Sequence, residues 1–407
     1  MFHIWNMKVA IIGGGAAGFF AAFSSKEHHP NAEIFLYEKS DKILSKVKIS
    51  GGGRCNVTHA CFQPSALSKF YPRGAKSLKK AFKFFQPRDT IKWFSDRDVA
   101  LKTESDNRMF PISDNSQTIV DCFLRELQVK KIELIKNARI IKIIPNINGY
   151  YLCFKNHKIY FDKVIIASGG SSKSRGFDWL KNLGHHIISP IPSLFTFNMP
   201  NESITKLMGV VVKNAKVRIQ GTKLEYQGPV LITHWGMSGP GILKLSSWGA
   251  KFLHERNYEF NVQINWISIK SEQDVFYFFS EKFDSLKRKK MANANPFSLP
   301  NRIWLYFLDK LHICPNSIWS DLSKKNINRL INILLNDVYE VSGKTTFKEE
   351  FVTCGGVSME DVQENTMQSK VCPNIYFAGE VLNIDGITGG FNFQSAWTTG
   401  FIAGKLE

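Results

Sequence analysis

The sequence lacks a hydrophobic stretch long enough to cross a membrane. Hydrophobic residues make up 43% of the 407 residues. No apolar run, however, approaches the roughly 18 residues that a membrane-spanning helix needs. The residues before Met7 are too few for a signal peptide, and a strand pattern begins directly after Met7, so Met1 and Met7 are both candidate starts. We therefore expect a soluble protein without a membrane partner.

Paired cysteines are also missing. The seven cysteines are an odd number without a CxxC spacing, and His59 and Cys61 complete no zinc-binding pattern. Such cysteine usage in a large chain is typical of a cytoplasm that keeps thiols reduced. The sequence therefore predicts a cytoplasmic protein with neither disulfides nor a metal site.

Acidic residues are scarce: 35 Asp and Glu stand against 53 Lys and Arg, a formal net charge of +18. Such an excess is typical of proteins that bind nucleic acid or anionic membranes, and it also suits a phosphate-bearing cofactor. The cations are scattered, and the aromatic, basic segment 70–94 suits a helical core face with solvated lysines better than a nucleic-acid stripe. Nucleic acid is therefore the less favoured partner, and a small-molecule substrate the favoured one.

The most informative motif in the sequence is a glycine-rich stretch near its start. Lys8–Gly18 reads KVAIIGGGAAG, a buried-strand pattern followed by GxGxxG on Gly13, Gly15 and Gly18. In this pattern the glycines allow a tight turn, let the backbone approach a pyrophosphate and let the next helix pack closely. The helix expected over Phe19–Ser25 would point its N-terminal N–H groups at phosphates.

An acidic residue stands where the ribose of a dinucleotide would need it. A second apolar strand, Glu33–Tyr37, ends at Glu38, which lies 20 residues past Gly18. A ribose-binding carboxylate is expected about 20 residues after the last glycine of this fingerprint. The pattern therefore predicts a dinucleotide-binding domain rather than an ordinary strand, turn and helix.

A second glycine loop lies at Lys46–Asn56, with the sequence KVKISGGGRCN. Its backbone N–H groups converge, and Lys46 and Arg54 can neutralise a phosphate or hold an anionic substrate. The alternative is a mobile surface turn. Cys55 could be a redox thiol, but a buried packing role is favoured because no second cysteine lies at CxxC distance.

The C-terminal segment returns to the strand and glycine-turn pattern. Ile375–Glu380 is a short apolar strand, a glycine-rich turn follows over 385–392, and Gln394–Gly404 suits a helix. A second turn of this kind is not needed for NAD, but it suits a flavin. Glu380 can accept hydrogen bonds from ribityl hydroxyls, and the helix start near Asn392 can stabilise negative charge on a reduced flavin ring.

Between these parts the pattern changes after Pro190. Alternating β-rich segments at 210–220, 223–233 and 258–266 predict an inserted β-domain, a small barrel, and 271–337 is mostly helical. Within the insert, His234 lies in the shaped loop 233–241 and is a candidate active-site residue, although a lone histidine is more often structural. Elsewhere we expect a helix over 117–128, strands within 132–144, a strand over 150–160 entering a turn at 156–157, and a loop over 104–113.

These motifs together resemble a known family. KVAIIGGGAAG, KISGGGRCNVTH (48–59), THWGMSGPGIL (233–243), TCGGVS (353–358) and the segment 375–404 are similar to the HI0933-like flavoproteins. That family includes NAD(P)- and FAD-dependent oxidoreductases of the aminoacetone oxidase and BaiN-type bile-acid reductase kinds. The chain departs from it at Leu44, Ser45 and Lys46, where the family often has Gly-Arg-Lys, and at Phe391 and Phe393, where it often has Tyr and Leu.

The resemblance implies an α/β fold: a three-layer Rossmann-type FAD-binding domain over 1–190 and 345–407. It further implies an inserted β-barrel domain over 191–270 and 338–344, which carries a helical subdomain over 271–337. It implies FAD contacts from Gly13, Gly15, Ala16, Ala17, Gly18, Glu38, Lys39, Lys46, Ser50, Gly52, Gly53, Arg54, Cys55, Asn56, Ile140, Ser168, Gly169, Gly379, Glu380, Asp385, Gly390, Phe391 and Asn392.

The function expected from these observations is that of a soluble FAD-dependent oxidoreductase. Hydride would pass between flavin N5 and a small organic substrate or NAD(P)H, with Arg54 and His234 as candidate catalytic residues. No second GxGxxG follows a strand, so NAD(P)H would have to visit the flavin transiently. The alternatives are an RNA-associated flavoprotein that uses the basic surface and the insert, and a flavin-binding protein with little turnover.

Overall fold

The computed structural model describes residues 6–346 and 352–407. Met1, one of the two expected starts, lies outside these residues, and so do residues 347–351 near the expected return into the first domain. The chain divides into two compact units. The first contains residues 1–193 and 347–407, and the second contains residues 194–346.

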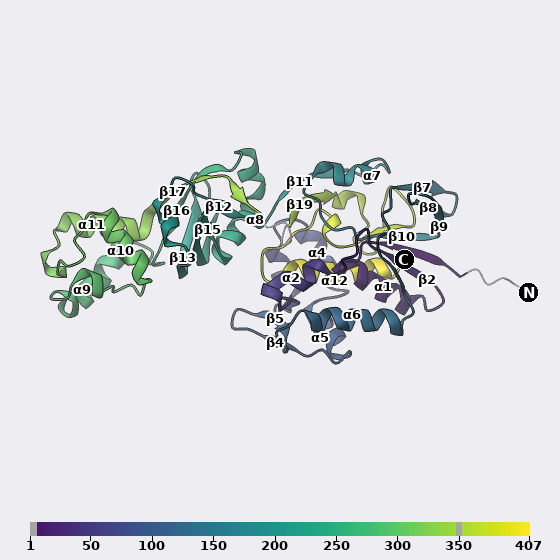
Figure 1. Ribbon diagram of the computed structural model, residues 1–407, viewed down its shortest axis with the longest axis horizontal. Helices are drawn as coiled ribbons and strands as arrows, with labels where there is room; N and C mark the ends of the chain where they lie inside the picture. The colour runs from purple at the N-terminus through teal and green to yellow at the C-terminus, as the bar shows by residue number, and fades with distance from the viewer. Residues whose placement is uncertain (1–5, 347–351) are drawn as a thin grey trace, which may run out of the picture. The chain divides into compact units, whose positions relative to one another are not determined.

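A five-stranded parallel sheet forms the centre of the first unit (Figure 1). Its order is β20 (Ile375–Phe377), β10 (Lys163–Ile166), β1 (Lys8–Ile12), β2 (Glu33–Tyr37) and β6 (Glu133–Ile135). All four neighbouring pairs are parallel. The last strand of the chain therefore shares a sheet with the first, as the sequence predicts, and the fold is the expected Rossmann-type α/β fold.

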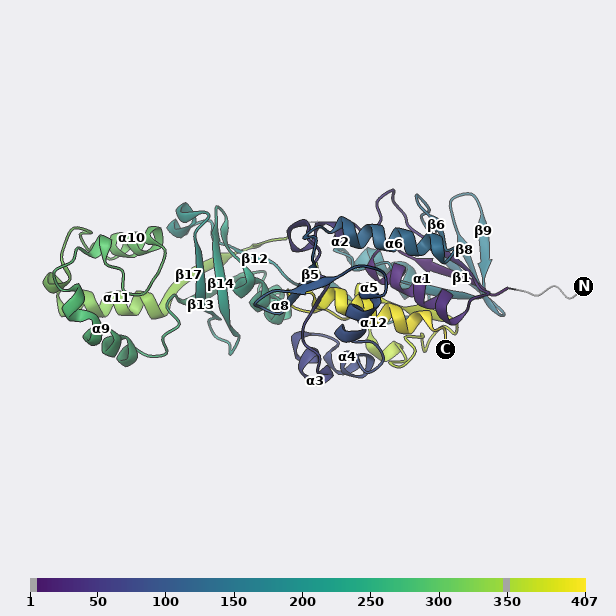
Figure 2. The same cartoon turned by 90° about the horizontal axis from the view of Figure 1, so that it is seen from below.

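Two helices with small residues pack tightly beside this sheet, α1 (Ala16–His28) and α12 (Phe391–Gly404), as Figure 2 shows. A Cβ built on Gly400 would lie 2.7 Å from the carbonyl oxygen of Ala17, and one on Gly404 would lie 2.5 Å from Cβ of Ser24. Side chains larger than glycine would push the helices apart. Gly400 and Gly404 therefore allow the N- and C-terminal helices to pack closely against each other.

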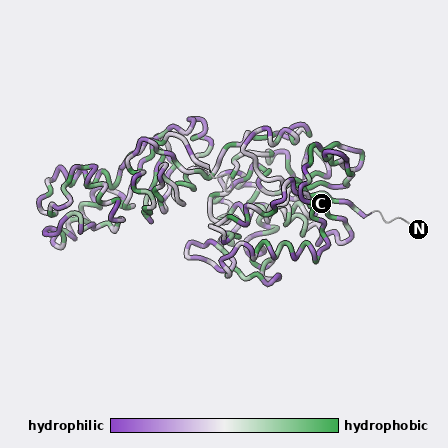
Figure 3. Tube along the Cα trace, in the orientation of Figure 1, coloured by the Kyte–Doolittle hydropathy of each residue, from purple (hydrophilic) through white to green (hydrophobic). Residues whose placement is uncertain are grey.

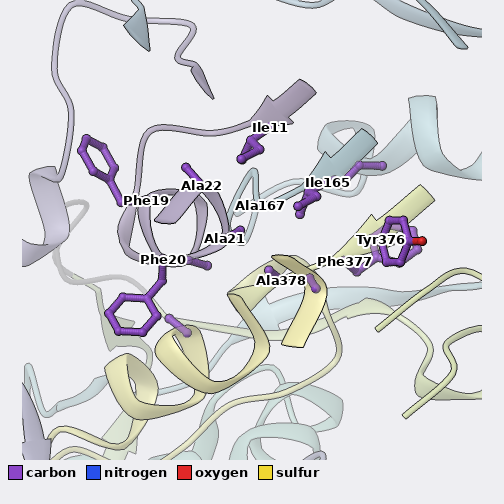
Figure 4. Packing of buried hydrophobic residues seen from close by; sticks show 14 of the residues in the cluster. Ile11, Phe19, Phe20, Ala21, Ala22, Ile165, Ala167, Tyr376, Phe377 and Ala378 are labelled. Atoms are coloured by element: carbon purple, nitrogen blue, oxygen red, sulfur yellow. The ribbon is translucent and has the colours of Figure 1, made fainter. Parts of the chain in front are cut away.

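The buried residues of α1 meet those of three strands in one core (Figure 4). Phe19 and Phe20 of α1 are buried, as are Ile11 of β1 and Ile165 of β10. Phe377 of β20 joins them. These apolar runs are continuous because a parallel sheet is buried on both faces.

The remaining elements of the first unit surround this core. The other helices are α2 (Ser45–Gly53), α3 (Pro64–Leu67), α4 (Ala75–Ala81), α5 (Pro87–Ser95), α6 (Gln117–Val129) and α7 (Asp178–Lys181). Three small antiparallel sheets contain β3 (Thr58–His59), β5 (Arg108–Pro111) and β4 (Leu101–Thr103); β7 (Lys142–Asn146), β8 (Gly149–Cys153) and β9 (Lys158–Phe161); and β11 (Ile187–Pro192) and β19 (Thr353–Val357).

The second unit contains a seven-stranded sheet and four helices. In spatial order its strands are β17 (Asp337–Ser342), β16 (Glu259–Asn265), β13 (Val211–Ile219), β14 (Glu225–Thr233), β15 (Gly236–Ser238), β12 (Thr196–Asn198) and β18 (Lys344–Thr345). Its helices are α8 (Pro240–Glu255), α9 (Glu272–Leu286), α10 (Asn301–Lys310) and α11 (Lys324–Asn336). Green hydrophobic and purple hydrophilic stretches alternate along these helices in Figure 3, as expected of helices with one buried face. The barrel expected for this segment stays a prediction.

Three expected elements differ from the structure. The loop expected over 104–113 contains the strand β5, which forms a hairpin with the preceding strand β4 and pairs on its other side with the distant strand β3. The strand expected over 150–160 is a hairpin, because the turn at 156–157 lies inside it rather than at its end. The glycine loop at 46–56 begins as helix α2, which Ser50, Gly51 and Gly52 leave through non-helical backbone angles.

Candidate functional site

The ends of four strands meet at the carboxyl edge of the parallel sheet. Ile12 of β1 pairs with Tyr37 of β2 and Ile166 of β10, and Ile166 pairs with Phe377 of β20. The predicted site residues Gly13, Glu38, Ser168 and Gly379 follow these strand ends within one or two positions. Ligands of open parallel sheets bind at this edge.

The fingerprint glycines place backbone where a side chain could not fit. Gly13 has a φ of +120°, and a Cβ on it would lie 2.3 Å from the carbonyl oxygen of Ala167. A Cβ on Gly18 would lie 1.9 Å from the carbonyl oxygen of Gly13. These two positions therefore require glycine for the strand–turn–helix packing alone.

Other glycines face open space instead. A Cβ built on Gly15, Gly52, Gly53 or Gly169 would meet no atom within 4 Å among the described residues. Gly15 also caps α1, whose N-terminus has no side-chain cap in the described chain. The first N–H groups of a helix need partners, and a phosphate can supply them. Ala16, Ala17 and Gly18 provide these N–H groups, so this cradle fits a pyrophosphate.

Glu38 is held in place at the end of β2. Its Oε2 accepts from the N–H of Gly14 at 2.9 Å, and its Oε1 accepts from the N–H and the hydroxyl of Ser40, both at 3.0 Å. Oε2, which accepts only one hydrogen bond, keeps acceptor capacity for a ribose hydroxyl. The neighbouring Lys39 is exposed.

The segment before Ile140 is bound beside Glu38. The N–H of Ala138 donates to the carbonyl of Glu38 at 2.9 Å, and that of Asn137 donates to the carbonyl of Ser40 at 3.0 Å. Ile140, two residues further, is half-buried against the first unit's core. The structure thus brings the segment before Ile140, an implied FAD contact, next to Glu38, which is predicted to bind the ribose.

Lys46 and Glu380 come together although 334 residues separate them. Nζ of Lys46 donates to Oε2 of Glu380 at 2.6 Å, and the N–H of Thr353 donates to the other carboxylate oxygen at 2.8 Å. The Lys46 side chain is 46% exposed, which leaves its cation accessible to a further anion. Ser168 is exposed at the end of β10, beside Gly169.

Arg54 is bound to acidic side chains of its own unit. Its guanidinium pairs with Glu104 at 2.6 Å and Asp114 at 3.5 Å, and it lies 4.0 Å from the ring centroid of Phe110. The hydrogen bond to Glu104 raises the pKa of Arg54 above its ordinary value. These contacts hold the end of the glycine loop, and the catalytic role of Arg54 stays a prediction.

Cys55 and Ser50 have structural surroundings. Cys55 is fully buried, and burial raises the pKa of its thiol to about 12. A thiol with such a pKa carries almost no thiolate at neutral pH, which favours packing over redox chemistry. The hydroxyl of Ser50 donates to the carbonyl of Val47 at 3.1 Å, and the carbonyl of Ser50 accepts from the N–H of Cys55.

Hydrogen bonds join the C-terminal glycine turn to Asn56, at the end of the second glycine loop. In the orientation that satisfies both groups, the Asn56 amide accepts from the N–H of Gly390 at 3.0 Å and donates to the carbonyl of Thr58 at 3.1 Å. Both amide groups of Asn392 bond the backbone of Gly386 at 2.8 Å. The turn that begins α12 is therefore rigid before any ligand binds.

Phe391 points into the core rather than outward. It is buried and stacks on Phe70 and His59, with ring centroids 4.5 and 4.6 Å apart. A Cβ on Gly379 would lie 2.7 Å from the Cβ of Ala17 in α1. The two turns predicted to hold opposite halves of a flavin dinucleotide are thus adjacent at Gly379.

Sequence reasoning missed a buried ion pair behind this turn. Arg73 donates to both carboxylate oxygens of Asp385, and the hydroxyl of Ser193 donates to the same carboxylate at 2.6 Å. Asp385 is fully buried, and burial raises the pKa of its carboxyl despite the guanidinium. The carboxylate of Asp385 already accepts hydrogen bonds from two side chains. The cofactor contact implied for Asp385 stays a prediction. No local pattern pointed to Arg73, because its partners lie 120 and 312 residues away.

His234 lies in the second unit, between β14 and β15. It is exposed, and its ring lies edge-on to Trp235 at 4.3 Å. Its active-site role stays a prediction.

Candidate metal clusters and candidate membrane-spanning helices are both absent from the described residues 6–346 and 352–407. Within them, no three His, Cys, Asp or Glu side chains gather closely enough to hold a metal ion. None of the helices there is both long and apolar enough to pass through a bilayer.

Comparison with known proteins gives a family match along nearly the whole chain. Residues 7–406 match the family model described as "HI0933-like protein Rossmann domain". The chain is 26% identical over 406 residues to a 3-dehydro-bile acid delta(4,6)-reductase of Clostridium scindens, and covers 98% of both proteins. It is 27% identical over 398 residues to a ribosomal RNA dihydrouridine synthase of Escherichia coli, covering 96% of this chain and 95% of that one.

Solved structures share the fold at low sequence identity. One is a 3-ketosteroid-delta4-(5alpha)-dehydrogenase from Rhodococcus jostii in complex with 4-androstene-3,17-dione. The match has a TM-score of 0.52 and 10% identity, and it covers 99% of this chain and 98% of that chain. It supports the Rossmann-type fold.

Proposed function

Because the chain belongs to the HI0933-like protein Rossmann domain family, we propose that it is an FAD-dependent oxidoreductase. The observation that carries the proposal is the open glycine cradle at the carboxyl edge of the parallel sheet. Gly15, Gly52, Gly53 and Gly169 face free space there, beside a held carboxylate at Glu38. When bound, FAD would supply hydride transfer between its N5 and a small organic substrate or NAD(P)H.

The residues on the cradle have separate tasks in this proposal. The N–H groups of Ala16 and Ala17 at the start of α1 bind the pyrophosphate, and Glu38 accepts from ribose hydroxyls. Lys46 and Glu380 orient the ribityl chain of FAD, which links the phosphates to the flavin ring, because their ion pair lies near the end of β20. The N-terminus of α12 stabilises negative charge near Asn392.

The direction we propose is reduction of the substrate. The names delta(4,6)-reductase and dihydrouridine synthase both describe the addition of hydrogen to a substrate. The matches extend over 98% and 95% of these two relatives. A reductase needs a donor, and NAD(P)H visiting the flavin is the donor we propose.

RNA is a second candidate substrate. Two relatives, at 27% and 24% identity, are named ribosomal RNA dihydrouridine synthases, and the net charge of +18 suits a polyanion. In this case the reduced group would be a pyrimidine base rather than a small molecule.

Anaerobic photometry of the purified protein tests the proposal. NADH and NADPH are added in turn, and loss of the oxidised-flavin absorbance is followed; candidate acceptors are then added to the reduced protein. We expect one nicotinamide to bleach the flavin and an acceptor with an activated double bond to restore it. A flavin that neither nucleotides nor organic donors reduce would favour a binding protein with little turnover.

A further inference from the structure

The segment 42–88 carries eleven Lys and Arg residues and no Asp or Glu. It begins just before the second glycine loop, at 46–56, and ends at the start of α5. Because the rest of the chain mixes both signs of charge, this segment concentrates positive charge in the first unit. Such a run without acids is the electrostatic pattern of a polyanion contact.

Part of this positive charge lies on one face of helix α4. Ser77, Leu78 and Ala81 are buried, whereas the lysines occupy the exposed positions of the helix and the turn after it. We call this surface the α4 lysine face; it consists of Lys76, Lys79, Lys80 and Lys83. Their spacing places all four on one side of a helical turn.

The α4 lysine face is compensated only near Glu364, whose pKa is lowered by Lys80 and, less strongly, by Lys76. Lys80 pairs with Glu364. In the part of the chain that the structure describes, no carboxylate forms an ion pair with Lys76, Lys79 or Lys83. Like charges three and four residues apart destabilise a helix by about 0.2–0.5 kcal/mol per pair. A phosphate chain along the face would remove this repulsion.

Two aromatic rings of the segment 42–88, the exposed Phe84 and the half-buried Phe62, lie beside two cations outside the α4 lysine face. Phe84, next to Lys83, is 44% exposed, and Nζ of Lys405 lies 5.6 Å from its ring centroid. The Arg88 guanidinium lies 4.9 Å from the ring centroid of Phe62. Exposed rings beside cations are the stacking platforms of proteins that bind single-stranded nucleic acid.

The start of α4 is fastened to the C-terminal glycine turn. Gly74 caps the helix, and a Cβ on it would lie 2.4 Å from Ile384. Arg73 binds Asp385, and the Tyr71 hydroxyl donates to the carbonyl of Phe391 at 2.7 Å. The start of α4 therefore adjoins the turn that we propose for the flavin, as the ribbon in Figure 2 shows.

We propose that the α4 lysine face binds the phosphate backbone of an RNA substrate, with Phe84 as a platform for an unpaired base. The proposal rests on the flavin-dependent reduction proposed above and selects RNA as its substrate class. It adds a role to the arrangement expected from the sequence, in which the segment 70–94 has a helical core face and solvated lysines. The structure shows a helix with both: a buried face and a separate cationic one.

The test is fluorescence anisotropy of the full-length protein with a fluorescein-labelled single-stranded RNA of 20 nucleotides. The variant carries Lys76→Ala, Lys79→Ala and Lys83→Ala. Its matched control removes three exposed lysines of the second unit, Lys213→Ala, Lys251→Ala and Lys270→Ala. Flavin content is measured in each protein by its visible absorbance.

We expect the α4 variant to bind the RNA about tenfold or more weakly and its slope of log K against log salt to fall by about 2, because each single-strand phosphate contact contributes about 0.7. The control should keep wild-type affinity. Equal losses in variant and control, or no RNA binding by the wild type, would overturn the proposal. Binding to vesicles of phosphatidylserine without binding to RNA would also overturn it, in favour of a membrane surface. Absent flavin would contradict the proposed function instead, because the anisotropy does not depend on it.

Discussion

Two residues of one fingerprint, Gly15 and Gly18, have opposite surroundings. A Cβ on Gly18 would lie 1.9 Å from a backbone oxygen, whereas one on Gly15 would meet only open space among the described atoms. We expect Gly18→Ala to lower the free energy of unfolding by about 1–3 kcal/mol through overpacking. Gly15→Ala should leave the stability of the flavin-free protein unchanged and weaken FAD binding, because the methyl group enters the cradle. Urea unfolding and flavin titration measure both effects. Full FAD affinity in Gly15→Ala would mean that the open space is not the phosphate site.

Glu38 makes a second prediction at this scale. Its carboxylate is held by Gly14 and Ser40 with acceptor capacity left over. Hydrogen bonds to a charged group contribute about 1.5–3 kcal/mol, so Glu38→Ala should weaken FAD binding roughly ten- to a hundredfold. Glu33→Ala, an exposed glutamate five residues earlier, is the control. An unchanged affinity of Glu38→Ala would show that this carboxylate only holds its own loop.

Arg54 and His234 are the candidate catalytic residues, and one experiment compares them. If either residue contacts the substrate, we expect its alanine variant to retain FAD but to show a slower flavin reduction or reoxidation than the wild type. Arg54→Ala also breaks the contacts to Glu104 and Asp114, so its unfolding midpoint is measured beside its rate. Stopped-flow photometry of Arg54→Ala and His234→Ala gives the answer. Wild-type rates in both variants would place the chemistry elsewhere on the flavin face.

Local sequence was sufficient for some residues of the candidate site and not for others. The spacing of Gly13, Gly18 and Glu38 pointed to positions that the structure brings to one edge, because all three belong to one strand–helix–strand unit. Asp385 could not be paired with Arg73 in the same way, since burial of that pair depends on a contact across 312 residues. The sequence around Arg73 contains no Asp or Glu that could have been proposed as its partner.

At the scale of elements, the helices and strands whose burial follows directly from hydrophobic spacing were predicted best. The strand Glu33–Tyr37 has the expected bounds, and helix α6 ends one residue past its expected bounds, because burial follows their hydrophobic spacing directly. Strand β5 was missed, since Arg108 and Pro111 suit a loop and only pairing with β3 and β4 makes the segment extended. Pairing between distant segments is the information that local patterns lack.

The shared sheet gives a prediction for a fragment. Strand β20 supplies one edge of the parallel sheet, and α12 packs on α1 through Gly400 and Gly404. A fragment of residues 1–193 lacks both, so we expect it to bind no FAD and to have a lower unfolding midpoint than the full chain. Circular dichroism and flavin titration of the fragment check this. Stable FAD binding by the fragment would contradict the need for the C-terminal segment.

At the scale of the whole molecule, the first unit is discontinuous in sequence. The chain leaves it after β11 and returns before β19, and these two strands pair antiparallel, with Pro192 opposite Thr353. The ends of the insertion are therefore adjacent within the first unit, which explains how the sheet can close around β20 with 153 residues of another unit between Ser193 and residue 347. The fold of the insert itself was predicted only as β-rich and helical segments, because the order of its strands depends on distant pairs.

The central claim is that this chain binds FAD across the first glycine cradle and the C-terminal turn. The most direct measurement is release of the cofactor from the purified full-length protein by heat or acid, followed by chromatography against FAD and FMN standards. We expect FAD, non-covalently bound and equimolar with the chain. Release of FMN, or no flavin after reconstitution with FAD, would contradict it.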